Sequence, residues 1–228
     1  MTFDSEVARS RREPGVPLRG YGIGVQVALL LVAAVDAVEV PALLHRRALA
    51  REGAADPQSI SLPAYRNADH AVSVLGTLEL ATLVIAAVAF LAWFYRARKN
   101  ADGFATVTHR RAPAWAFWGW FCPVVNFWFP YQIATDTLRA SDRGRDPGWV
   151  PQSYLLIKLW WAAFVVAGIF DRLVVASHPD NLKSFATHDG YLVVGNILTI
   201  VAAALAVLVV GRISASNDRF RHSILLTA

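Results

Sequence analysis

Four long apolar runs decide what this chain can fold into. They occupy residues 22–44, 71–95, 154–176 and 191–211. At about 1.5 Å per residue, a helix of about 20 residues crosses a hydrocarbon core of about 30 Å, and each run reaches that length. Backbone groups inside lipid must pair within their own segment, so such runs form helices. The sequence therefore predicts an all-α fold, an integral membrane four-helix bundle over residues 21–215.

The first apolar run has to be distinguished from a cleaved signal peptide. Basic residues precede it, and an Ala-Leu-Ala sequence ends at Ala50, as a cleavage site would. However, the run is long enough to span, and His45, Arg46 and Arg47 stand before that site. We therefore predict a retained membrane anchor.

The distribution of basic residues predicts the orientation in the membrane. Most of the 22 Lys and Arg residues lie in the polar tail 1–20, between the second and third runs, or after the fourth run and into the tail 216–228. Cytoplasmic loops carry an excess of Lys and Arg, so both termini are expected in the cytoplasm. The basic residues flank the apolar runs and form no single stripe, which favours lipid over nucleic acid as the partner. The basic side chains are nearly all arginine, and alanine and valine are abundant, which suggests a GC-rich bacterial genome. The expected location is therefore the plasma membrane of a bacterium.

The segment 114–138 is rich in aromatic residues and admits two interpretations. Its length would allow a fifth span, which would invert the C-terminal half of the chain. Against a span, Pro123 and Pro130 interrupt a helix, and tryptophan prefers the membrane interface. We predict a Trp/Pro-rich interfacial or re-entrant helical segment over 113–141, with a break at the prolines and an amphipathic helix ending near Ser141. The single cysteine, Cys122, is expected to be a small buried residue.

An ordered set of residues around this segment indicates a family. The patterns W-x-x-R-A-x-x-N and W-F-x-P-x-x-N-x-x-x-P occur in order, carried by Trp93, Arg96, Asn100, Trp115, Trp120, Phe121, Pro123, Asn126 and Pro130. Together they resemble the signature of actinobacterial membrane proteins of the domain-of-unknown-function 4328 family, over roughly residues 70–215. The resemblance implies a multi-span membrane domain and no assigned reaction.

The signature residues have a structural and a functional interpretation. Arg96 and Asn100 are four apart and share a helix face, while the prolines leave backbone carbonyls free. An arginine near those carbonyls would lock the loop. Alternatively, Arg96, Arg98 and Lys99 would bind a lipid headgroup or another anion together with the Trp-rich segment.

Several polar residues fall inside the apolar runs, where they are costly and are candidates for function. They are Asp36, Glu39, Glu79, Asp171, Arg172 and Asn196. Counted along the helices, these residues reach similar depths near the outer surface. They predict a network inside the bundle in which Arg172 pairs with one acid. The sharper alternative is a proton, cation or small-solute site of a small transporter or ion-coupled protein.

Four histidines lie at the outer ends of the runs, namely His45, His70, His178 and His188. Beside acids they could bind a transition metal, but no HxxxH or HExxH spacing is present. They are therefore interpreted as polar caps at the interface, with a metal-binding membrane protein as a weaker alternative. No cofactor is predicted.

No enzyme motif occurs in the sequence. A Walker loop, G-x-S-x-G, C-x-x-C and H-E-x-x-H are all missing. We predict a non-enzymatic structural, scaffold or sensing module whose aromatic segment contacts lipid. Membrane lipid is the expected partner, with a second copy or another membrane protein as further candidates.

Overall fold

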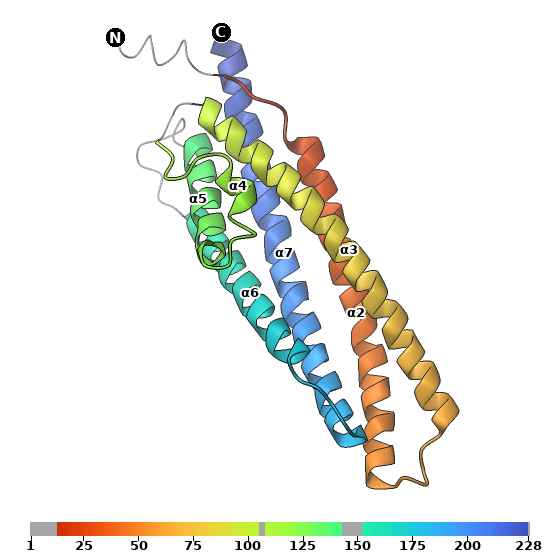
Figure 1. The fold of residues 1–228 in the computed structure, drawn as a ribbon. Helices are drawn as coiled ribbons and strands as arrows, with labels where there is room; N and C mark the ends of the chain where they lie inside the picture. Colours follow the sequence, from red (N-terminus) through yellow and green to blue (C-terminus); the bar gives the residue numbers. More distant parts are fainter. Residues whose placement is uncertain (1–12, 105–107, 143–151, 228) are drawn as a thin grey trace. The chain divides into compact units, whose positions relative to one another are not determined.

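The computed structural model describes residues 13–104, 108–142 and 152–227. Four long helices make up most of this part of the chain (Figure 1): α2 Arg19–Ala55, α3 Leu62–Gly103, α6 Gln152–Val175 and α7 Leu182–Thr227. Each contains a stretch that is long and apolar enough to cross a membrane. The predicted all-α membrane helical bundle is confirmed.

The helices extend beyond the apolar runs from which they were predicted. α2 continues through the supposed cleavage site at Ala50, and α7 continues to Thr227. After Gly211 the sequence has neither Gly nor Pro to end a helix. The expected C-terminal tail is therefore helical up to residue 227. Of the N-terminal tail, residues 1–12 lie outside the described residues.

The aromatic segment forms three short elements: α4 Trp115–Trp118, the 3-10 helix η1 Val125–Phe127, and α5 Phe129–Asp142. α4 and η1 both contact α5, and α4 and α5 lie side by side in Figure 1. Pro130 is the second residue of α5, where a missing N–H costs nothing, so it starts this helix instead of breaking it. None of these elements is long enough to span. The predicted order of a helix, a break and a second helix is found, and the segment is not among the four candidate spans of the described residues. Its place at the membrane interface stays a prediction.

The contacts divide the chain into two compact units. The first unit comprises Met1–Val27, Ala87–Trp160 and Ala206–Ala228, and the second comprises Ala28–Ala86 and Trp161–Leu205. The long helices contribute residues to both units.

The first unit has an aromatic core. Phe90 lies at the centre, with ring centroids 5.3–5.9 Å from the surrounding rings of Trp93, Phe94, Trp120 and Trp160. Such offset and edge-to-face pairs contribute about 0.5–1.5 kcal/mol each beyond area burial. A second contact joins Phe104 to Phe220, with centroids 4.8 Å apart.

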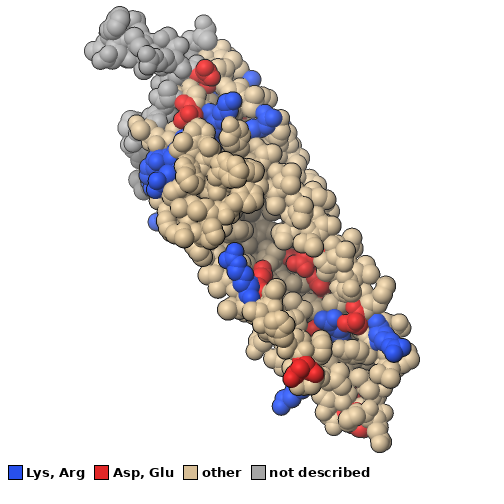
Figure 2. All heavy atoms as spheres, viewed as in Figure 1, with Lys and Arg blue, Asp and Glu red and all other residues tan. Residues whose placement is uncertain are grey.

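The second unit is packed through small residues. Ala28, Val32 and Ala86 are buried together, as expected where helices in lipid approach closely. Large apolar side chains such as Leu80, Ile85 and Leu173 are instead exposed, as lipid-facing residues would be. Figure 2 shows large uncharged areas between scattered groups of charged side chains.

Candidate functional sites

Asn100 joins three segments of the first unit. Its side chain accepts a hydrogen bond from the Val16 N–H (3.0 Å) and donates one to the Val16 carbonyl (2.7 Å). It also donates to Oδ1 of Asn217 on α7 (2.9 Å). The neighbouring Gly15 has φ +64°, and a Cβ there would collide with Asn100. Part of the expected surface tail is therefore fixed to α3.

The other signature residues of α3 have different surroundings. Trp93 is fully buried and donates from Nε1 to Oγ of Ser214 (2.9 Å), so it cannot face lipid. Arg96 is exposed and lies over the ring of Tyr21, 4.5 Å from its centroid. Trp93 and Asn100 act inside the unit, whereas Arg96 lies at its surface.

The arginine that locks a loop is Arg98 and not Arg96. Arg98 is 1% exposed and donates to the carbonyl of Arg111 (2.6 Å) and to Asp102 (3.1 Å). That carbonyl precedes the Trp-rich segment and does not belong to the Pro123–Pro130 stretch. The prediction named the right interaction but the wrong partners. Arg98 is thereby excluded from the proposed anion site, while Lys99 and Arg96 stay exposed.

α5 is held by the segment that precedes α4. Nε and Nη2 of Arg110 both donate to the carboxylate of Asp136, at 3.0 and 2.8 Å. These bonds raise the pKa of Arg110 above its ordinary value. Arg111 lies 4.1 Å from the ring centroid of Phe129 and donates to Gln132. Nε2 of His109 donates to the carbonyl of Ala101 (3.1 Å).

The surroundings of His109 change its titration. Burial lowers its pKa below the ordinary value, and the hydrogen bond to Ala101 opposes this only in part. Its Nδ1 has no partner among the described residues. The surroundings of His109 therefore favour its neutral form.

Exposed apolar side chains follow one another along the segment after α4. We call this surface the aromatic rim and define it by Trp118, Phe121, Val124, Phe127 and Trp128, all exposed. Cys122 lies among them and is exposed too, so the expectation of a buried cysteine is wrong.

The signature residues of this segment are divided between the rim and the interior. Trp120 packs on Phe90 and Phe94 at 5.5 and 6.0 Å, and Trp115 packs edge-on against Phe129. Phe121 and Pro123 are exposed, Pro130 is buried, and the N–H of Asn126 donates to the Cys122 carbonyl. Of the predicted lipid-facing set, Phe121 and Pro123 are thus exposed, whereas Trp93 and Pro130 are buried and Trp120 packs on the aromatic core.

The second unit brings three of the predicted acids together. Asp36 and Glu39 project from α2 and Glu79 from α3, and one oxygen of each lies within 4.8 Å of the others. Asp36 is 0% exposed and Glu39 is buried. Glu39 accepts a hydrogen bond from Nδ2 of the buried Asn196 on α7 (3.2 Å). We call Asp36, Glu39 and Glu79 the acid cluster.

Arg172 is not part of this arrangement, whereas Asp171 lies close enough for its charge to act on Asp36 and Glu79. Asp171 lies on α6 facing Gly195, where an added Cβ would be 3.0 Å from its Oδ1. Arg172 is exposed, and no ion pair joins it to an acid in the described ranges. The prediction that Arg172 pairs with one of the acids is therefore wrong for the described residues.

The comparison with known families decides which class of protein this is. Residues 56–215 match the family described as a domain of unknown function, DUF4328. The chain belongs to the DUF4328 family. No curated protein and no solved structure matches it. The matched region contains Glu79, Asn196 and the whole first-unit signature, whereas all of α2, with Asp36 and Glu39, precedes it.

Arg46 connects α2 to the DUF4328 region, an interaction that was not predicted from the sequence. Arg46 donates to Asp69 at 2.8 Å and, through Nε and Nη2, to the buried Asp189 at 3.1 and 2.6 Å. Arg46 lies beyond the first apolar run, so it was not among the charged residues inside the runs that were predicted to form a site. Its position next to His45, at an expected helix end, was the sequence feature that could have indicated this role.

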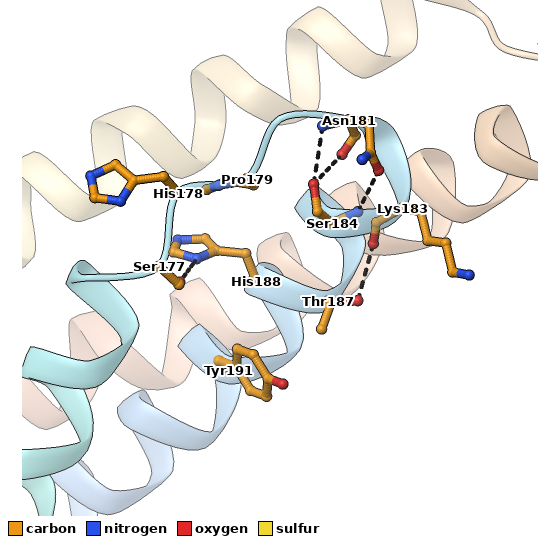
Figure 3. Close-up of a pocket in the computed structure, with 9 residues that line it drawn as sticks. All are labelled: Ser177, His178, Pro179, Asn181, Lys183, Ser184, Thr187, His188 and Tyr191. Atoms are coloured by element: carbon orange, nitrogen blue, oxygen red, sulfur yellow. Dashed lines mark hydrogen bonds between the residues drawn. The ribbon is translucent and has the colours of Figure 1, made fainter.

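The four histidines do not form one site. His178 and His188 line a pocket of about 370 Å³ formed by the loop after α6 and the start of α7, where Nδ1 of His188 lies 2.9 Å from Oγ of Ser177 (Figure 3). His45 and His70 are exposed on α2 and α3. Among the described residues, the acid cluster is the group with the spacing of a metal site, and it contains no histidine.

Proposed function

We propose that this DUF4328 protein is a non-enzymatic membrane module, structural, scaffolding or sensing, whose aromatic rim rests in the lipid interface. We further propose that this interface is the cytoplasmic face of a bacterial plasma membrane, with both termini on that side. The observation that carries the proposal is the rim itself. Trp118, Phe121 and Val124 are 60%, 59% and 65% exposed on a segment too short to span.

A surface of this kind requires an apolar or interfacial environment. Contiguous exposed apolar residues mark membrane or protein contacts, and tryptophan is enriched where headgroups meet acyl chains. Beside the rim, α3 and α4 enclose an apolar pocket of about 540 Å³ whose lining includes Leu91, Phe117 and Trp118. An acyl chain matches the chemistry of that lining. Lipid therefore accounts for both the rim and the pocket.

The charges near the rim favour anionic headgroups. Arg96 and Lys99 are exposed at the end of α3. Basic residues near an anionic surface contribute about 1 kcal/mol each to membrane attraction. The Arg110–Asp136 pair and the packing of Trp120 hold the rim on a fixed support, so little ordering entropy is lost when it enters lipid.

The single cysteine gives a direct test, because Cys122 lies within the rim. A nitroxide attached to Cys122 of the full chain in anionic lipid nanodiscs should collide more often with oxygen, which partitions into lipid, than with a water-soluble nickel chelate. The matched control carries Cys122→Ser and Gln58→Cys, which moves the label to the exposed turn between α2 and α3. That label should show the opposite preference. Equal access of the nickel chelate to both labels would overturn the proposal.

A further inference from the structure

The acid cluster is a compact set of oxygen ligands. Asp36 and Glu39 are three residues apart on α2, so both side chains leave the same helix face. Glu79 reaches them from α3, and the chosen oxygens all lie within 4.8 Å of one another. Two oxygens on opposite sides of an ion at about 2.3–2.6 Å are separated by about 4.6–5.2 Å. The three carboxylates can therefore share one ion.

Asp36 points separately to a ligand. It is 0% exposed, and neither Oδ1 nor Oδ2 has a hydrogen-bond partner among the described residues. A buried polar group without a partner costs about 1–3 kcal/mol, and a charged one costs more. Because its oxygens face Glu39 and Glu79, the carboxylate is directed into the cluster and not toward a protein donor.

The protein supplies little positive charge to this cluster. Arg172 is exposed, and Arg46 is committed to Asp69 and Asp189. Glu39 accepts hydrogen bonds from Asn196 and from the Glu79 side chain, and these are the donor interactions shown for the cluster in the described part of the chain. Three carboxyl groups thus converge with one amide and one shared proton between them.

We propose that Asp36, Glu39 and Glu79 form a binding site for a hard divalent cation of the Mg²⁺, Mn²⁺ and Ca²⁺ class, with Asn196 orienting Glu39. Carboxylate oxygens are the ligands these ions prefer, and the cluster has neither sulfur nor imidazole to favour zinc or copper. Glu79 is only half buried and provides the side from which an ion enters. This site is independent of the aromatic rim, so either proposal can fail without the other.

Manganese is the probe for the test, because free Mn²⁺ has a strong electron paramagnetic resonance signal that is lost on binding. The full chain in nanodiscs of zwitterionic lipid, which binds little Mn²⁺, should take up one ion per chain with saturation. Asp36→Asn and Glu79→Gln should each weaken this binding at least tenfold. Glu52→Gln removes an exposed carboxylate from the same helix and should leave binding unchanged.

Thermal unfolding separates loss of the site from loss of the fold. Without metal, Asp36→Asn should melt at or above the temperature of the wild type, because an unpaired buried charge has been removed. Mn²⁺ should raise the melting temperature of the wild type and not that of Asp36→Asn. The proposal is overturned if the wild type binds no Mn²⁺ at millimolar concentration, if both cluster variants bind normally, or if Glu52→Gln weakens binding as much as they do.

Discussion

A single amide side chain fixes the N-terminal segment to two helices. Asn100 presents one acceptor and two donors, and all three are used by Val16 and Asn217. An amide matches the paired N–H and C=O of a backbone residue, which neither a hydroxyl nor a carboxylate can do. Replacing Asn100 therefore leaves several buried groups unpaired at once.

Asn100→Ala should destabilise the protein by about 2–4 kcal/mol, because three hydrogen bonds are lost and their partners stay partly buried. The measurement is reversible unfolding in detergent, compared with Lys99→Ala at the adjacent exposed position. Lys99→Ala should change the free energy of unfolding by less than about 0.5 kcal/mol. Equal stabilities for the two variants would show that the amide interactions contribute nothing.

The roles of residues could be predicted where they follow from the type of side chain. They could not be predicted where they depend on a partner far away in the sequence. The sequence marked Asn100 as important, but its partner Val16 lies in a tail that composition assigns to the surface. Arg96 and Arg98 are about 200° apart around the helix, and only the position of Arg111 decides which of them is buried. Ser214 and Asn217 were missed, although their i, i+3 spacing beyond the last apolar run indicates a shared face.

At the scale of elements, the position of α5 depends on side-chain contacts with its neighbours. Its amphipathic pattern predicts a helix, and its C-terminal residue Asp142 accepts a hydrogen bond from Ser216 of α7. Its other face is attached through Asp136 to Arg110. Asp136 is largely buried, so loss of Arg110 leaves a carboxylate with fewer partners. The position of the segment therefore depends on this ion pair.

A double-mutant cycle should measure that dependence. Arg110→Ala and Asp136→Ala should each destabilise the fold, and the coupling between them should be about 1–2 kcal/mol, since the pair is bidentate but Arg110 is 45% exposed. Thermal unfolding of the two single variants and the double variant gives this energy. Strict additivity would mean that the pair does not position α5.

The positions of elements were predicted better than their ends. Apolar runs located the four long helices because lipid allows no other backbone for them. The apolar run underestimated the length of α7, because polar residues after Gly211 continue a helix as readily as apolar ones do. Pro130 was interpreted as a breaker, although at the second position of a helix a proline is compatible with the fold.

At the scale of the whole molecule, the four candidate spanning helices predict that both termini lie on the same side of the membrane. Fluorescent-protein and alkaline phosphatase fusions in a bacterial host test this prediction. A fluorescent protein after Thr227 should fluoresce, and phosphatase at that site should be inactive, as expected in the cytoplasm. Phosphatase inserted at Gln58, in the turn between α2 and α3, should be active. Active phosphatase at the C-terminus would require a fifth span or an inverted protein.

The acid cluster shows how far sequence reasoning reaches for a site. Counting residues along each helix placed Asp36, Glu39, Glu79 and Asn196 at similar depth, and the structure brings them together. Depth along a helix does not give the direction of a side chain around the helix axis. The same count therefore included Arg172, which is exposed and forms no ion pair with the acids in the described ranges. Whether a polar residue faces its neighbours depends on side-chain packing that no hydropathy pattern contains.

The boundary of the family match bears on which features other DUF4328 members share with this protein. Two of the three cluster carboxylates lie on α2, before the region that DUF4328 members share, and the third lies within it. We therefore expect that a member of the family can keep the fold without the complete cluster. A relative with other residues in place of Asp36 and Glu39 would keep the family architecture and retain a lone glutamate. Function should accordingly be transferred between members by comparing their first helices and not by family membership.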